Sequence, residues 1–195
     1  MKVKICGITH QEDALICEEL GADALGLVYF PGRSRSLDLD TISEVMSTVG
    51  PFTRRVLVCN PSSVEEALFM IERTGADLLQ VYNLDVDELL ELKEYGVDII
   101  RAVPPVREEA VKFAQCTEAL IFEGSLPGTG TEYDYETVPV DACRRAIIAG
   151  GLKPDNVDRV KKLSPYGVDV SSGVELTPGR KDPLLVEEFI RRCRA

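Results

Sequence analysis

The sequence is short of the residues that bind metal ions. Its 195 residues include a single histidine, His10, and six scattered cysteines with no C-x-x-C pair among them. Such a set is poor material for zinc or iron–sulfur ligation, so we expect no metal site. A disulfide framework is equally unexpected in a chain of this kind, and most of the thiols should be small buried hydrophobes. His10 stands next to a helix cap and is expected at the surface.

Positive charge is also scarce. Lys and Arg number 22 against 33 Asp and Glu, which gives a formal net charge of -11 at pH 7. This balance argues against nucleic acid and against an anionic membrane surface as partners. No apolar run is long enough to span a bilayer, and the first residues are typical of a strand rather than a signal peptide. We therefore expect a cytoplasmic protein in which any anionic substrate meets a local positive site.

A recurring tripeptide, Gly-Ala-Asp or Gly-Val-Asp, marks how the chain is organised. It occurs at 21–23, 75–77, 96–98 and 167–169, each time between a helical pattern and a short apolar run. Glycine in this place ends a helix in the left-handed conformation, and the residues after it begin a strand. Repeated helix–glycine–strand units predict alternating β and α elements around a parallel sheet.

Eight such units can be followed along the chain. The expected strands cover 3–6, 24–30, 55–59, 78–82, 98–103, 119–123, 145–149 and 168–170. The first helix opens with a capping box at Thr9, the second has Asp38 as its N-cap, and only a short turn at 135–138 follows the sixth strand. We predict an α/β fold: one compact (β/α)8 TIM barrel of eight parallel strands, with residues 1–195 as a single domain. The alternative is an open doubly wound sheet, but no G-x-G-x-x-G motif follows the first strand.

Two small-residue turns end the last two strands. One contains Gly150 and Gly151, and the other is Ser171-Ser172-Gly173. Backbone N–H groups converge in such turns and bind anions, which predicts a phosphate site at this end of the barrel. The competing interpretation is that these are ordinary turn and cap residues.

Side chains at the carboxyl ends of barrel strands face the active site. Strand alternation groups Lys4 with Cys6 and turns Glu123 and Asp169 inward. A carboxyl and a thiol beside a small pocket suit an acid–base pair, and an ammonium near Cys6 favours its thiolate. Simpler interpretations are a buried thiol as packing, an ion pair between Lys4 and Glu123, and a solvated loop at 33–35. The residues expected at the inner top are Lys4, Cys6, Arg101, Glu123 and Asp169, with Arg35 reaching in from the second loop.

The motifs K-I-C-G-I-T at 4–9, A-G-G-L at 149–152 and G-V-D-V-S-S-G-V-E at 167–175 occur in this order along the chain, followed by Pro178-Gly179 and Lys181-Asp182. Together they resemble the phosphoribosylanthranilate isomerase family, (β/α)8 enzymes of tryptophan biosynthesis. The resemblance implies a cofactor-free Amadori rearrangement of a small phosphoribosyl substrate. By the same resemblance Cys6 is the general base and Glu123 the general acid, and Arg35 receives the anthranilate carboxylate. Asp169 is assigned to substrate binding, and phosphate lies on Gly150, Gly151, Ser171, Ser172 and Gly173.

Three positions depart from the family pattern. Glu123 stands where the family has Asp, Tyr82-Asn83 replaces His-Gly after the fourth strand, and Thr131 replaces a lysine in the loop 128–135. The altered acid side leaves two alternatives open: an isomerase of a different phosphoribosyl-amine, or a silent barrel that binds a sugar phosphate. The sequence does not distinguish a monomer from a homodimer.

Overall fold

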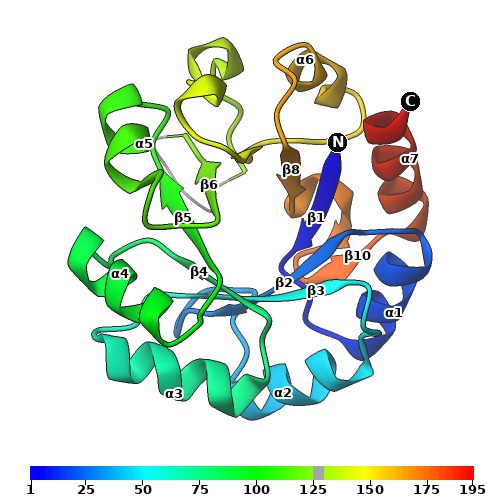
Figure 1. Ribbon diagram of the computed structural model, residues 1–195. Helices are drawn as coiled ribbons and strands as arrows, with labels where there is room; N and C mark the ends of the chain where they lie inside the picture. Colours follow the sequence, from blue (N-terminus) through cyan, green and yellow to red (C-terminus); the bar gives the residue numbers. More distant parts are fainter. Residues whose placement is uncertain (125–129) are drawn as a thin grey trace.

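Eight parallel strands close into a barrel in the computed structural model, which describes residues 1–124 and 130–195 (Figure 1). Strand β1 pairs with both β2 and β8, which closes the sheet on itself. The predicted barrel is therefore confirmed, and the open doubly wound sheet was the wrong alternative. The strands are β1 (Lys2–Cys6), β2 (Ala24–Tyr29), β3 (Arg54–Cys59), β4 (Leu78–Val81), β5 (Ile99–Val103), β6 (Ala119–Phe122), β7 (Ala146–Ile148) and β8 (Gly167–Val170).

The helices form a ring outside the barrel, and both chain ends lie on the same side of that ring (Figure 1). They are α1 (Gln11–Glu19), α2 (Leu39–Thr48), α3 (Val64–Thr74), α4 (Val86–Glu94), α5 (Arg107–Phe113), α6 (Val157–Lys161) and α7 (Pro183–Arg194). Between β6 and β7 the described chain makes two 3-10 turns, η1 (Tyr135–Thr137) and η2 (Val140–Ala142). In the part of the chain that the structure describes, no helix combines the length and apolarity that crossing a membrane requires.

Strand alternation divides the apolar residues into two cores. The larger core lies between strands and helices and includes Ile5, Leu27 and Phe122. The smaller core fills the barrel interior with side chains from β3, β5, β6 and β7, such as Val58, Ile100 and Ile121. Because apolar side chains fill the interior below, the polar inward residues gather at the carboxyl ends of the strands, where the site lies.

The local signals were confirmed at some positions and wrong at others. Asp38 caps α2 by accepting from the Thr41 N–H at 2.8 Å, and Gly75 ends α3 with φ of 68°. Thr9 does not cap α1: its hydroxyl donates to the Gly179 carbonyl, and the N-cap is His10, an exposed residue without a side-chain cap bond. Gly167 is not a helix cap either, because it already belongs to β8.

A small hairpin follows β8 where a polar loop was expected. The 3-10 turn η3 (Ser172–Val174) leads into β9 (Glu175–Thr177), which pairs antiparallel with β10 (Arg180–Lys181). The register sets Lys181 opposite Glu175. The hairpin therefore brings a buried cation and a carboxylate together beside the barrel mouth.

Candidate active site

A cavity of about 460 Å³ opens at the carboxyl ends of the strands. It is the place where a (β/α)8 barrel carries its site. Eight of the nine residues assigned a catalytic or binding role line it, from β1, β8 and the loops after β2, β6, β7 and β8. These are Cys6, Arg35, Glu123, Gly150, Gly151, Asp169, Ser171 and Ser172.

Lys4 and Asp169 form a buried ion pair on neighbouring strands. The Lys4 Nζ lies 2.7 Å from Asp169 Oδ1, and the two side chains are 4% and 7% exposed. Burial disfavours the ammonium, but the charges of Asp169 and Cys6 outweigh burial and raise the pKa of Lys4. Lys4 is therefore a fixed cation, and its partner is Asp169 rather than Glu123.

Cys6 lies beside this pair and faces Gly26 of β2. A Cβ on Gly26 would come within 2.9 Å of the Cys6 Sγ and 3.0 Å of the Lys4 Nζ, so glycine leaves the room that both groups occupy. Burial raises the pKa of the Cys6 thiol, and although Lys4 favours the thiolate, as predicted, it does not cancel the effect of burial. The resting group at neutral pH is the thiol.

Glu123 follows β6 on the other side of the cavity. Burial, together with the charge of Asp169, raises the pKa of its carboxyl to about 7, while Lys4 and a hydrogen bond from Tyr82 act in the opposite direction. A carboxyl that titrates near neutral pH is suited to give up a proton during catalysis.

Arg35 is held by a network that includes the hairpin. Its Nε and Nη2 donate to the two Glu175 carboxylate oxygens at 2.9 and 2.7 Å. Lys181 Nζ donates to the same carboxylate at 2.8 Å and to the Cys6 carbonyl at 2.7 Å. These bonds fix the direction of the Arg35 guanidinium, so the interpretation of Arg35 as part of a solvated loop was wrong. Sequence reasoning gave Glu175 and Lys181 no role, although both belong to the motif that carried the resemblance.

The two glycine turns lie against each other at the cavity rim. Gly150 and Gly151 have φ of 92° and 64°, values that favour glycine. A Cβ on Gly173 would lie 1.9 Å from the Leu152 carbonyl oxygen, so this glycine lets the turn after β8 touch the turn after β7. Gly173 is absent from the described cavity lining, which gives it a packing position behind Ser171 and Ser172.

Two tyrosines fasten the chain after β6 to this rim. The Tyr135 hydroxyl donates to the Gly150 carbonyl at 2.7 Å and the Tyr133 hydroxyl to the Phe122 carbonyl at 3.1 Å. Of the predicted loop 128–135, Gly128 and Thr129 lie outside the described residues, whereas Thr131 lines the cavity. Among residues 1–124 and 130–195, no group of three His, Cys, Asp or Glu side chains is placed to hold a metal ion.

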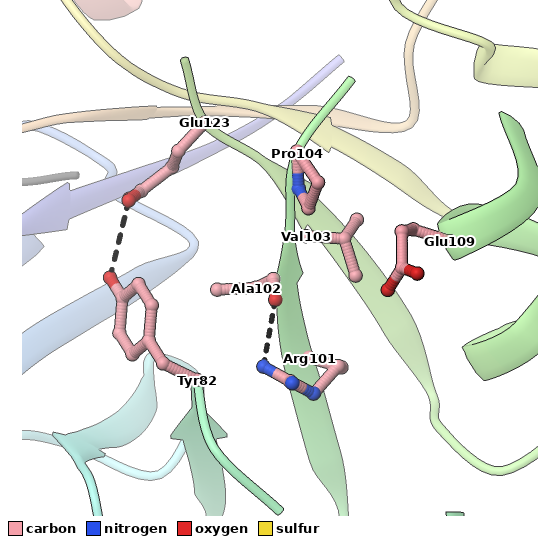
Figure 2. A pocket seen from close by; sticks show the side chains of 7 residues that line it. All are labelled: Tyr82, Arg101, Ala102, Val103, Pro104, Glu109 and Glu123. Atoms are coloured by element: carbon pink, nitrogen blue, oxygen red, sulfur yellow. Dashed lines mark hydrogen bonds between the residues drawn. The ribbon is translucent and has the colours of Figure 1, made fainter. Parts of the chain in front are cut away.

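Arg101 was wrongly expected inside the barrel. Its neighbours Ile100 and Ala102 point into the interior core, so alternation turns Arg101 outward toward α5. There its guanidinium lies 4.6 Å above the Phe113 ring. It also donates to the Ala102 carbonyl at 2.8 Å (Figure 2). The strand assignment was right, and only the face of Arg101 was wrong.

The closed barrel, with a thiol and a carboxyl lining one cavity and paired glycine turns at its rim, is the architecture of a (β/α)8 enzyme. The sequence model of the N-(5'-phosphoribosyl)anthranilate (PRA) isomerase family matches residues 3–192. The chain belongs to this family of isomerases of tryptophan biosynthesis, as the motifs indicated.

Relatives match along the whole chain. The N-(5'-phosphoribosyl)anthranilate isomerase of Methanothrix thermoacetophila is 40% identical, over 100% of this chain and 98% of its own. The crystal structure of phosphoribosyl anthranilate isomerase from Thermus thermophilus has a TM-score of 0.91 at 34% identity, covering 100% of this chain and 98% of that one. A further structure, at TM-score 0.89, 29% identity and the same coverage, is an isomerase in complex with reduced 1-(o-carboxyphenylamino)-1-deoxyribulose 5-phosphate.

Proposed function

We propose that this chain converts N-(5-phosphoribosyl)anthranilate to 1-(2-carboxyphenylamino)-1-deoxyribulose 5-phosphate, with Glu123 as general acid and Cys6 as general base. The observation that carries the proposal is that these two titratable groups line one cavity together with Arg35 and both glycine turns. The ligand named in the related complex contains the carboxyphenylamino and phosphate groups that such a cavity would need to bind. We further propose that residues 1–195 act as one domain, in the cytoplasm, as a monomer or homodimer.

The rearrangement divides into proton transfers at the two ring atoms next to C1 of the sugar. Glu123 gives its proton to the furanose ring oxygen, the bond from that oxygen to C1 breaks, and the nitrogen lone pair forms a C=N bond. The Cys6 thiolate then takes the proton from C2, the electrons of that C–H bond form the C1=C2 double bond of the enolamine, and the π electrons of the C=N bond return to nitrogen. Ketonisation removes the proton of the C2 hydroxyl and adds one to C1. Substrate and product have the same composition, so no oxidant or reductant is consumed.

The other cavity residues bind the two anionic ends of the substrate. Arg35 presents its remaining N–H donors to the anthranilate carboxylate, because a guanidinium has five and Glu175 engages two. The backbone at Gly150, Gly151, Ser171 and Ser172 receives phosphate, with Gly173 holding the turns together. Asp169 lines the cavity, where we assign it to substrate binding. Its negative charge also raises the pKa of both Cys6 and Glu123.

The working enzyme form carries a protonated Glu123 and a deprotonated Cys6. The pKa of Glu123 is about 7 and that of Cys6 is raised above its usual value. At a pH between these two pKa values, the dominant form therefore has an ionised Glu123 and a protonated Cys6. The working form is then a minor one. The working form and the dominant form each bind one proton, so their ratio does not change with pH. The fraction of the working form therefore grows with pH up to the pKa of Glu123, stays constant, and falls above the pKa of Cys6.

The test is turnover of freshly generated phosphoribosylanthranilate, followed by the loss of its fluorescence. Wild type should turn over, and Cys6→Ser and Glu123→Gln should each lose about 10²- to 10⁴-fold in kcat, the range for a general acid or base. Retained phosphate binding in both variants, measured by calorimetry, controls for folding. Wild-type inactivity with intact phosphate binding would overturn the proposal.

A further inference from the structure

A second, smaller cavity lies on the far side of Glu123. Its volume is about 210 Å³, and it extends between β5 and α5. Figure 2 shows Glu123 and Tyr82 on one side of it and Arg101 and Glu109 on the other. Since Tyr82 and Glu123 also line the main cavity, these two side chains form a wall shared by both spaces.

The wall is joined by a directed chain of hydrogen bonds. Gln80 Nε2 donates to the Tyr82 oxygen at 3.1 Å, and the Tyr82 hydroxyl donates to the two Glu123 carboxylate oxygens at 3.3 and 3.4 Å. Because its oxygen accepts from Gln80, the phenol keeps its proton for the carboxyl. Burial and the charge of Glu123 raise the pKa of Tyr82 well above its ordinary value, so it stays a donor at working pH.

Packing fixes the phenol, whereas Glu123 has room to move. The Phe30 ring meets the Tyr82 ring edge-on, with centroids 5.8 Å apart. A glutamate has one more rotatable bond than an aspartate, and here the smaller cavity offers its carboxyl a second space. Hydrogen bonds of 3.3–3.4 Å are long, as is usual for catalytic contacts before substrate binds.

We propose that Tyr82 is a positioning residue for the general acid: its hydroxyl holds the Glu123 carboxyl in the main cavity and out of the smaller one. This inference rests on the proposed function. The charged and titratable groups around the carboxyl are Lys4 of β1, Tyr82 after β4, Asp169 of β8, and Tyr133 in the chain after β6, with Arg101 and Glu109 across the smaller cavity. Of the neighbours, Tyr82 alone donates a hydrogen bond to it among the described residues.

The first test is Tyr82→Phe, which removes the hydroxyl and keeps the ring. We expect kcat to fall about tenfold, because misplacing an acid by an ångström is costly. The lower limb of the kcat/KM profile, which follows Glu123, should move up by roughly one pH unit, since the lost bond favoured the charged carboxyl. Tyr133→Phe is the matched control: it removes a hydroxyl from the same cavity that is bonded to a backbone carbonyl instead, and the limb should stay in place.

A double-mutant cycle separates positioning from general damage to the fold. Adding Tyr82→Phe to Glu123→Gln should cost no further activity, because the group that Tyr82 positions is already gone; equal losses in both backgrounds would overturn the inference. The Glu123 carboxyl can also be titrated without substrate, by infrared difference spectra against Glu123→Gln. An unmoved titration in Tyr82→Phe overturns the positioning role alone, whereas wild-type inactivity is what overturns the function.

Discussion

On the β1–β8 side of the cavity, Lys4 and Asp169 lie 2.7 Å apart and are almost completely buried, with Cys6 beside them. On the β4–β6 side, Glu123 is held by contacts of 3.3 and 3.4 Å and borders a second cavity. The side of the proposed base is thus a rigid charged cluster, and the side of the proposed acid is a loosely held carboxyl. This difference follows from chain position. Lys4 and Asp169 lie within paired strands, whereas Tyr82 and Glu123 each follow the last residue of a strand.

The largest effect is expected from breaking the rigid side. Lys4→Met leaves Asp169 buried without its partner, so the free energy of unfolding should fall by about 3–5 kcal/mol. Urea denaturation monitored by circular dichroism measures the change. Lys2→Met is the matched control, because Lys2 is 59% exposed in its pair with Asp23, and it should cost less than about 1 kcal/mol. Equal losses in the two variants would show that the buried Lys4–Asp169 pair stabilises the β1–β8 side no more than an exposed pair does.

The next effect concerns the side-chain length of the proposed acid. Glu123→Asp withdraws the carboxyl by one methylene from both Tyr82 and the substrate, so kcat should fall by about 10- to 100-fold with stability little changed. Steady-state kinetics on phosphoribosylanthranilate check this. Glu109→Asp makes the same change across the smaller cavity and should remain within about twofold of wild type. Full activity in Glu123→Asp would show that the acid side does not depend on the longer side chain.

The smallest effect is expected where the chain after β6 is tied to the proposed phosphate rim. Tyr135→Phe removes the 2.7 Å bond to the Gly150 carbonyl, which should lower stability by about 1 kcal/mol and weaken phosphate binding several-fold. Thermal unfolding and calorimetric titration with inorganic phosphate measure both. Tyr95→Phe, at a side chain that is 64% exposed, should change neither. An unchanged phosphate affinity in Tyr135→Phe would show that the bond from this loop to Gly150 does not contribute to phosphate binding.

Local sequence patterns predict much of the barrel. Glycines such as Gly75 end helices where the repeat predicted, and the alternation of Lys4 and Cys6 placed both groups on the inner face of β1. Arg101 shows the limit of that reasoning. Its polarity suggested an inward side chain, but the alternation of strand β5 turns it outward. There its guanidinium packs on the Phe113 ring, a contact that the sequence does not show.

The unpredicted parts of the site depend on contacts between distant segments. The bond from Arg35 to Glu175 joins residues 140 positions apart, and no local pattern reports it. The resting thiol of Cys6 likewise results from a balance, in which burial and the charge of Asp169 raise its pKa and Lys4 lowers it. The sequence names these residues but does not show which effect is larger. The smaller cavity between β5 and α5, which Tyr82 and Glu123 separate from the main one, results from the packing of distant segments.

The pH dependence of kcat/KM tests the acid–base assignment most directly. With Glu123 titrating at about 7 and Cys6 above its usual value, the rate should rise with pH to about 7, remain level, and fall only on the alkaline side. The lower limb should follow substitutions at Glu123, and the substrate's own ionisations should be common to all variants. A maximum below pH 7 followed by a decline would contradict the account, because it would require a base that titrates below the acid.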